Sequence, residues 1–412
     1  MRSLIKSALD EWSTWLNKAR KQLIPRNQTP PWPDGMALAF VGVRRSGKTF
    51  AAIEAAASRS ERVLYFNFED PVFVSDNRVQ HLDTIISVYQ EFSGHDPGVL
   101  IFDEIHNIDG WEKWVRKVVD TRRWPLIITG SSAKLLSSEI ATSIAGRCIE
   151  KTVWPLSYSE YLKFSDIRSA PSLASLRNYF KWGGFPALTE VNDPDTKTII
   201  LKQYLSDIVL KDVISRHEIR NKRHLDQIVA FAMTNLSSLF SYQSVRKAFG
   251  MTADVAQTYS GYLGEAFMLF EVQRYHHNLK VQARDPKKIY VIDPGLRRIA
   301  ARSVTDDLGK IAENIVYLEL RRRGHDIYYF QAKGEVDFVL VEGYRPLQAV
   351  QVCYSDMMDA PTFEREVGSL LEALVALDLS EGTILTLNRH ETLQEGKKTL
   401  RLIPLFEFLT QE

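Results

Sequence analysis

Hydrophobic and polar residues follow the periods of an α/β protein along this chain. Residues 1–26 predict an amphipathic helix, which packs either on its own protein or on a partner. Its apolar positions are Ile5, Leu9, Trp12 and Leu16. Continuous apolar runs then predict strands buried on both faces, with helix-compatible segments between them. These runs span residues 36–41, 62–68, 99–104, 125–129 and 148–154. We therefore expect an α/β fold whose core is a parallel sheet.

A glycine-rich segment follows the first strand run. Residues 42–49 read Gly-Val-Arg-Arg-Ser-Gly-Lys-Thr and fit the phosphate-binding pattern G-x-x-x-x-G-K-[ST] between a strand and a helix. In such a loop the backbone N–H groups turn toward a phosphate. Lys48 then reaches the β- and γ-phosphate oxygens, and Thr49 ligates Mg²⁺. The pattern predicts a nucleoside triphosphate site. Its expected contacts are Gly42, Arg44, Arg45, Ser46, Gly47, Lys48, Thr49 and Phe50.

Two carboxylates end a buried strand run at residues 99–104. Asp103 is expected to hold Mg²⁺ through water, and Glu104 to polarise the attacking water as the catalytic base. A further strand run, residues 62–68, lies between the phosphate loop and this pair. That insertion suits ATPases in which a catalytic glutamate follows the metal aspartate.

Two further residues are candidates for catalysis. Ser131 follows the strand run at residues 125–129, where its hydroxyl either senses the γ-phosphate or caps a helix. Arg147 either reaches a phosphate across a subunit boundary, which implies a homo-oligomer, or forms a surface ion pair. Both pairs of alternatives stay open at this point.

The middle of the chain predicts helices and a helix-turn-helix. Residues 156–221 are expected to be mostly helical, with a turn at residues 182–186. Residues 242–249 and a helix that begins after Thr252 form the helix-turn-helix. Strands at residues 278–283 and 288–292 would flank a wing. The module either binds duplex DNA or serves as a structural or protein-binding domain, since its second helix carries Asp254 and no nearby basic residue. The candidate DNA contacts are Gln257, Lys280, Arg284, Lys287 and Lys288.

Composition mainly excludes classes of protein. The 412 residues carry a formal net charge of +1, so any binding of nucleic acid has to use local patches. The two cysteines, Cys148 and Cys353, show no metal-ligand spacing and suit a reducing compartment. No run approaches the roughly 18 apolar residues of a membrane span. We expect a cytoplasmic protein without a membrane segment.

Several motifs together resemble one prokaryotic family. Besides the phosphate loop and the Asp-Glu pair, the chain carries Pro-Leu-Ser-Tyr-Ser-Glu at residues 155–160 and Gly-Gly-Phe-Pro at residues 183–186. In this order they resemble AAA-superfamily ATPases, common in archaea, over residues 27–355. The resemblance implies ATP and Mg²⁺ as cofactors. It also implies a P-loop ATPase domain, a helical lid, a winged helix and a small α/β restriction-endonuclease-like domain. The expected boundaries are 1–26 for the N-terminal helix, then 27–155, 156–221, 222–294 and 295–412.

The resemblance also implies a nuclease-type site in the last domain, and the sequence departs from it. Glu313 and Asp337 match the helix glutamate and the strand aspartate of such nucleases. Where Glu-x-Lys is needed, the chain has Gln351 and Cys353, so a metal carboxylate and the lysine are both missing. We expect a domain that does not cleave nucleic acid.

These observations predict a Mg²⁺-dependent ATPase that acts as a nucleotide-driven switch or motor on nucleic acid, with duplex or branched DNA as the candidate partner. The alternative is an ATP-binding interaction switch that assembles with a protein partner and does not bind DNA. A third interpretation, an ATP-dependent nuclease, is opposed by Gln351 and Cys353.

Overall fold

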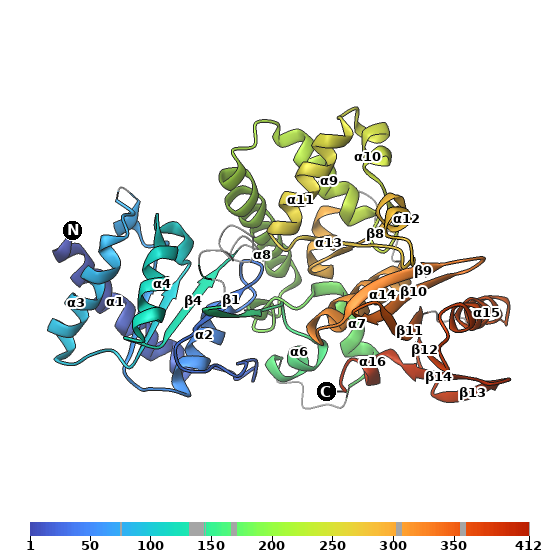
Figure 1. Cartoon of the computed structure of the whole chain (residues 1–412), viewed down its shortest axis with the longest axis horizontal. Coiled ribbons are helices and arrows are strands. Elements are labelled where there is room, and N and C mark those ends of the chain that lie inside the picture. Colours follow the sequence, from blue (N-terminus) through green and yellow to red (C-terminus); the bar gives the residue numbers. More distant parts are fainter. Residues whose placement is uncertain are drawn as a thin grey trace. The chain divides into compact units, whose positions relative to one another are not determined.

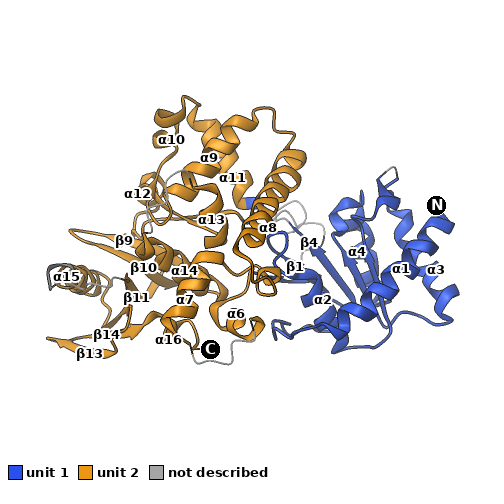
Figure 2. Cartoon of the chain, turned by 180° about the vertical axis from the view of Figure 1, so that it is seen from behind, with its two compact units in different colours: residues 1–154, 265–267 blue, residues 155–264, 268–412 orange. Residues whose placement is uncertain are grey.

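The chain folds into two units, which Figure 2 colours separately. Unit 1 holds residues 1–154 and 265–267, and unit 2 holds residues 155–264 and 268–412. The computed structural model describes residues 1–74, 76–131, 144, 146–165, 171–301, 307–354 and 360–411, with residues 360–362 described by their backbone alone.

Unit 1 is a parallel sheet with helices packed against it (Figure 1). Its strands run in the order β2-β3-β4-β1-β5, and each strand pair is parallel. This confirms the predicted α/β fold, and it places β4 between β1 and β3. The elements are α1 (Arg2–Lys21), β1 (Ala37–Val41), α2 (Lys48–Ala57), β2 (Val63–Asn67), η1 (Pro71–Phe73), α3 (Gln80–Ser93), β3 (Val99–Asp103), η2 (Ile105–Asn107), α4 (Trp111–Thr121), β4 (Leu126–Gly130) and β5 (Cys148–Thr152).

Alternation of side chains along each strand divides the core of unit 1 between the two faces of the sheet. One face presents Tyr65 and Ile101 to α1 and α2 in a single apolar cluster, to which α1 adds Leu16. The opposite face presents Phe102, whose ring lies 5.4 Å from that of Trp114 in α4. The N-terminal helix therefore packs on its own unit, which is one of the two alternatives predicted from the sequence.

Unit 2 begins with helices. A capping box starts α6, because the Ser157 side chain accepts from the backbone N–H of Glu160 while the Glu160 carboxylate accepts from the N–H of Ser157. The helices are α6 (Tyr158–Phe164), α7 (Leu173–Trp182), the short η4 (Pro186–Leu188), α8 (Pro194–Asp207) with the π-helix η5 (Ile208–Ser215), and α9 (Lys222–Thr234). The described part of residues 156–221 is thus mostly helical, as expected.

A helix-turn-helix and a small antiparallel sheet follow. Gly250 ends the first helix at φ 71°, and the second helix begins three residues later. The sheet has the order β6-β8-β7. The elements are β6 (Leu239–Phe240), α10 (Tyr242–Phe249), α11 (Ala253–Glu265), β7 (Leu269–Val272), α12 (Leu279–Arg284) and β8 (Lys287–Val291).

The strand predicted for residues 278–283 is wrong, because these residues form the helix α12. Alternating apolar and polar residues there imitate a strand. The side chain of Asn278 instead accepts a hydrogen bond from the N–H of Lys280 and starts a helical turn. The strand predicted for residues 288–292 is present as β8.

The C-terminal part of unit 2 is a six-stranded mixed sheet in the order β13-β14-β12-β11-β10-β9. β9, β10 and β11 are antiparallel neighbours, whereas β11 and β12 are parallel and are connected through α15. The elements are α13 (Pro294–Ala300), α14 (Leu308–Arg322), β9 (Asp326–Gln331), β10 (Glu335–Glu342), β11 (Arg345–Cys353), α15 (Ala360–Ala376), β12 (Glu381–Thr386), β13 (Glu391–Glu395), β14 (Lys398–Pro404) and α16 (Leu405–Phe408).

The Gly-Gly-Phe-Pro turn is fixed inside unit 2 by a buried carboxylate. Asp293 is 1% exposed and accepts hydrogen bonds from the N–H groups of Gly184 at 2.7 Å and Gly295 at 2.8 Å. Burial raises the pKa of Asp293 to about 7, although these N–H donors favour its charged form. The carbonyl of Gly184 in turn accepts from the N–H of Leu156 at 2.7 Å. The two motifs that carry the family resemblance therefore meet at one hydrogen-bonded junction.

This junction predicts a cost for any side chain at position 184. A Cβ at Gly184 would lie 2.3 Å from the carbonyl oxygen of Leu156, which belongs to the backbone and cannot rotate away. We expect Gly184→Ala to destabilise the protein by about 2 kcal/mol, measured by thermal unfolding. Gly261→Ala is the control, because that position is helical with open space around it and the substitution should be neutral or slightly stabilising. Equal melting temperatures for the two variants would contradict the packing argument.

Candidate active site

The glycine-rich loop between β1 and α2 has the backbone of a phosphate cradle. Gly42, Arg45 and Gly47 have positive φ angles of 144°, 71° and 100°. A Cβ at Gly42 would lie 2.3 Å from the carbonyl oxygen of Val153, so only glycine fits there. Gly47 begins α2 without a side-chain cap, which leaves the first N–H groups of the helix to face a ligand.

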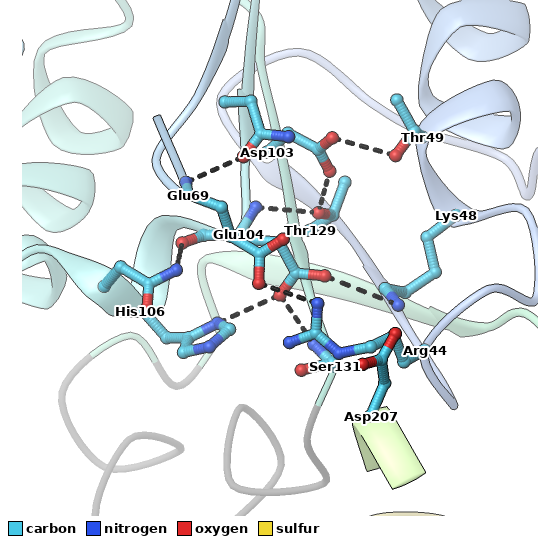
Figure 3. Close-up of polar contacts among 12 residues, drawn as sticks. Arg44, Lys48, Thr49, Glu69, Asp103, Glu104, His106, Thr129, Ser131 and Asp207 are labelled. Carbon is cyan, nitrogen blue, oxygen red and sulfur yellow. Dashed lines mark hydrogen bonds and ion pairs between the residues drawn. The ribbon is translucent and has the colours of Figure 1, made fainter. Parts of the chain in front are cut away.

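The ammonium group of Lys48 is the buried cation of this loop. Lys48 is 5% exposed, and its Nζ lies 3.2 Å from the carbonyl oxygen of Gly42 and 3.3 Å from that of Val43. The same nitrogen lies 3.5 Å from Oε1 of Glu104 (Figure 3). The loop thus combines backbone donors with an ammonium group, as a triphosphate requires.

Asp103 is held by hydroxyl groups from three elements. Its Oδ2 accepts from the Thr49 hydroxyl at 2.8 Å and from the Tyr65 hydroxyl at 2.7 Å, while Oδ1 accepts from the Thr129 hydroxyl. Burial and the neighbouring Glu104 raise the pKa of Asp103, whereas these donors stabilise its charged form. The carboxylate is therefore fixed in orientation beside Thr49.

Glu104 is an ionised carboxylate at the mouth of the loop. Its Oε2 accepts from the N–H of Ser131 at 3.0 Å and lies 3.4 Å from Nδ1 of His106. Burial opposes ionisation, but Lys48, His106 and Arg44 outweigh it and lower the pKa of Glu104 to about 2. Its φ of 53° is unusual for a residue with a side chain and marks a constrained position. The carboxylate is therefore ionised at neutral pH, which is the form that a general base requires.

These residues fit a magnesium-bound nucleotide. Thr49 and Asp103 offer a hydroxyl and a carboxylate oxygen 2.8 Å apart, and Mg²⁺ prefers oxygen ligands. Ser46 lies in the loop with its Oγ buried and without a hydrogen-bond partner among the described residues. A phosphate oxygen would satisfy it.

Sequence reasoning missed four residues that support the site. They are Arg26, Tyr65, His106 and Thr129. Arg26 donates to the carbonyl of Ser46 at 2.9 Å and to that of Trp154 at 3.0 Å, so it fixes the loop from outside. Of these four residues, only Thr129 could have been found from the sequence, because it ends the predicted strand run at residues 125–129.

The other predicted nucleotide contacts take different positions. Arg44 is 8% exposed and pairs with Glu69 at 2.7 Å, whereas Arg45 is exposed and Phe50 is 39% exposed. Ser131 is buried, and its backbone N–H donates a hydrogen bond to Glu104. Arg147 forms an ion pair of 2.6 Å with Asp120, so its action across a subunit boundary stays a prediction.

The candidate DNA contacts separate into three groups. Gln257, Lys280 and Arg284 are exposed on α11 and α12. Lys287 is half-buried and pairs with Glu271 at 2.5 Å. The prediction that Lys288 contacts DNA is wrong, because Lys288 is 2% exposed and points to the opposite face of β8 from Lys287.

The four residues predicted as a vestigial nuclease site do lie together. Asp337 and Gln351 meet across β10 and β11, where the Asp337 N–H donates to the Gln351 side chain at 3.1 Å. Cys353 is 5% exposed, and burial raises the pKa of its thiol to about 11. Lys288 contacts both Glu313 and Asp337. The lysine of the nuclease motif is missing, as the sequence indicates, but a lysine from a distant strand brings an ammonium group to this site.

No helix in the described part of the chain is long and apolar enough to cross a membrane.

Comparisons with known proteins assign the part of the chain that carries the phosphate loop and the Asp-Glu pair to an AAA domain. A family model described as an AAA domain matches residues 34–162, and a model of a domain of unknown function (DUF8612) matches residues 173–307. The uncharacterised protein MJ1544 of Methanocaldococcus jannaschii is 31% identical over 393 residues, which cover 89% of this chain and 86% of that protein. An uncharacterised protein of Haemophilus influenzae is 30% identical over 315 residues, which cover 72% and 78%.

Among solved structures, the Holliday junction branch migration motor RuvB of Thermotoga maritima covers 66% of this chain and 88% of its own, at 17% identity and a TM-score of 0.31. The Orc1 protein of Aeropyrum pernix covers 77% and 93%, at 10% identity and a TM-score of 0.30. The sequence relatives carry the assignment: this chain, whose residues 34–162 match an AAA domain, belongs to the family of MJ1544 of Methanocaldococcus jannaschii.

Proposed function

We propose that this protein is a Mg²⁺-dependent ATP hydrolase that works as a nucleotide-driven switch. The observation that carries the proposal is the placement of Glu104. Its carboxylate is ionised, is anchored by the N–H of Ser131, and lies 3.5 Å from the ammonium of Lys48 in the phosphate loop. ATP as the nucleotide follows from the family resemblance.

The residues of unit 1 would divide the work of hydrolysis. The N-terminus of α2 and Lys48 bind the β- and γ-phosphates and neutralise the charge that develops there. Thr49 and Asp103 would hold Mg²⁺, which would neutralise negative charge on the phosphate oxygens. Glu104 accepts a proton from the attacking water, and positioned bases of this kind contribute roughly 10²–10⁴-fold.

The proposal predicts that Glu104→Gln separates binding from hydrolysis. The amide keeps the shape of the side chain but cannot accept the proton, so ATP should still bind while turnover falls by roughly 10²-fold or more. Titration calorimetry with ATP and GTP gives the affinities, and phosphate release gives the rate. Glu91→Gln is the control, because Glu91 is an exposed carboxylate on α3 that pairs with Arg2. Hydrolysis at the wild-type rate by Glu104→Gln would remove the carboxylate from the mechanism.

A second prediction concerns the orientation of Asp103. Tyr65→Phe removes the hydroxyl bonded to Asp103 but keeps the ring that contacts both Trp12 and Trp15. The Mg²⁺ concentration for half-maximal turnover should rise roughly tenfold, while the rate at saturating Mg²⁺ changes little. Tyr89→Phe, on α3, is the matched control. An unchanged magnesium dependence would show that Thr49 and Thr129 orient Asp103 without Tyr65.

We propose duplex or branched DNA as the target of the switch. The support is the element order α9-β6-α10-α11-β7-α12-β8, with β8 between β6 and β7, which is the order expected of the proposed winged helix. The second helix of the helix-turn-helix exposes Gln257, and the segment between β7 and β8 exposes Lys280 and Arg284. The competing proposal is a switch that binds a protein partner. It is favoured by the burial of Lys288 and by the pairing of Lys287 with Glu271.

A charge-removal experiment decides between these two targets. The double variant Lys280→Ala, Arg284→Ala should weaken DNA binding and lower the slope of log affinity against log salt by roughly two, measured by fluorescence anisotropy. Lys397→Ala, Arg345→Ala removes the same charge from exposed positions around the C-terminal sheet and is the control. If wild-type protein binds neither duplex nor branched DNA and its ATP turnover ignores both, the protein-partner proposal replaces the DNA proposal.

A further inference from the structure

A buried lysine binds three carboxylates at the start of the C-terminal sheet. The Nζ of Lys288 lies 2.8 Å from Glu313, 2.8 Å from Glu335 and 2.9 Å from Asp337. Lys288 is 2% exposed, Glu313 is 8% exposed and Asp337 is 6% exposed. An ammonium group has three N–H donors. That of Lys288 donates to Glu313 and to Asp337, and Glu335 lies within ion-pair distance.

The lysine is held in this position by the strand that carries it. Asn314 of α14 is fully buried, and its amide accepts from the N–H of Val291 at 2.8 Å and donates to the carbonyl of Val291 at 3.0 Å. The hydroxyl of Tyr290 donates to Glu313 at 2.7 Å. These contacts fasten β8 to α14, so Lys288 enters the site on a fixed backbone.

The charges of the cluster require a cation. Burial disfavours the ammonium form, but Asp337, Glu313 and Glu335 outweigh burial and raise the pKa of Lys288 well above its ordinary value. Burial and Asp337 raise the pKa of Glu313. Carboxylates this deep in a protein are costly unless a proton or a cation accompanies them, and Lys288 is the cation within hydrogen-bonding distance.

The donor set does not fit a divalent metal ion. The oxygens that a restriction-endonuclease-like layout turns toward a metal are turned here toward one nitrogen. Gln351 is engaged elsewhere, since its amide accepts from the N–H of Asp337 and donates to Glu366 at 2.6 Å. In the described part of the chain, no group of three or more His, Cys, Asp or Glu side chains is placed to hold a metal ion.

We propose that Lys288 is the built-in cation of this site: its ammonium occupies the place between Glu313 and Asp337 that a nuclease gives to a divalent metal. The site then joins β8 to α14 and β10 without a metal. A lysine that served as the nuclease lysine would turn its N–H groups toward water or phosphate, whereas Lys288 donates to Glu313 and Asp337 and pairs with Glu335. This inference concerns unit 2 and does not depend on ATP hydrolysis in unit 1.

Removing the cation should destabilise the protein and open a metal site. We expect Lys288→Ala to lower the melting temperature of the nucleotide-free protein by roughly 5–15 °C, because buried carboxylates lose their partner. Added Mn²⁺ should restore much of this loss. Electron paramagnetic resonance should show one more bound Mn²⁺ than in wild-type protein, with the phosphate loop unchanged between the two.

Two further measurements test the proposal even if Lys288→Ala does not fold. The variant Lys288→Met, Glu313→Gln, Asp337→Asn removes the charges together and should melt within a few degrees of wild-type protein. Wild-type protein and Asp337→Asn should bind the same number of Mn²⁺ ions, and wild-type protein should leave DNA intact with Mg²⁺ or Mn²⁺. Mn²⁺ binding or DNA cleavage by wild-type protein that Asp337→Asn abolishes would overturn the proposal. A melting temperature of Lys288→Met equal to that of wild-type protein would also overturn it.

Discussion

A carboxylate inside a protein needs a proton, a cation or several hydrogen-bond donors, and this requirement organises both units of the chain. In unit 1, Glu104 is charged because Lys48 and His106 lie within 3.5 Å and 3.4 Å of it. In unit 2, Lys288 serves Glu313, Glu335 and Asp337. The two buried lysines thus differ in their surroundings. Lys48 faces backbone carbonyls and one carboxylate in a loop, whereas Lys288 is enclosed by carboxylates.

That difference separates a site built to receive a ligand from one that is complete in itself. Around the phosphate loop, the first N–H groups of α2 and the hydroxyl of Ser46 are donors suited to phosphate oxygens. Around Lys288, the ammonium group donates to Glu313 and Asp337, and the Tyr290 hydroxyl donates to Glu313. The proposed ligand of the first site, a triphosphate with its metal, would supply the missing acceptors. The second site gains nothing from a metal as long as the lysine remains.

Backbone packing explains why two short motifs carry so much of the family resemblance. Leu156 and Gly184 belong to segments far apart in sequence, yet they are hydrogen-bonded to each other, and Asp293 binds Gly184 from a third segment. No side chain fits at Gly184, and the carboxylate of Asp293 fills the space beside Gly183. These positions therefore constrain the fold of unit 2.

The sequence by itself determined the parallel sheet, the phosphate loop and the Asp-Glu pair. Strands buried on both faces, a glycine-rich turn and adjacent carboxylates are local patterns, and each is complete within about ten residues. It also showed that Gln351 and Cys353 break the nuclease pattern. Tertiary structure alone decided that Tyr65 binds Asp103, that Arg26 supports the loop, and that Lys288 lies inside a carboxylate cluster and not on a wing. The physical reason is that these contacts join residues from 20 to 128 positions apart, whereas periodicity reports only which face of its own element a side chain occupies.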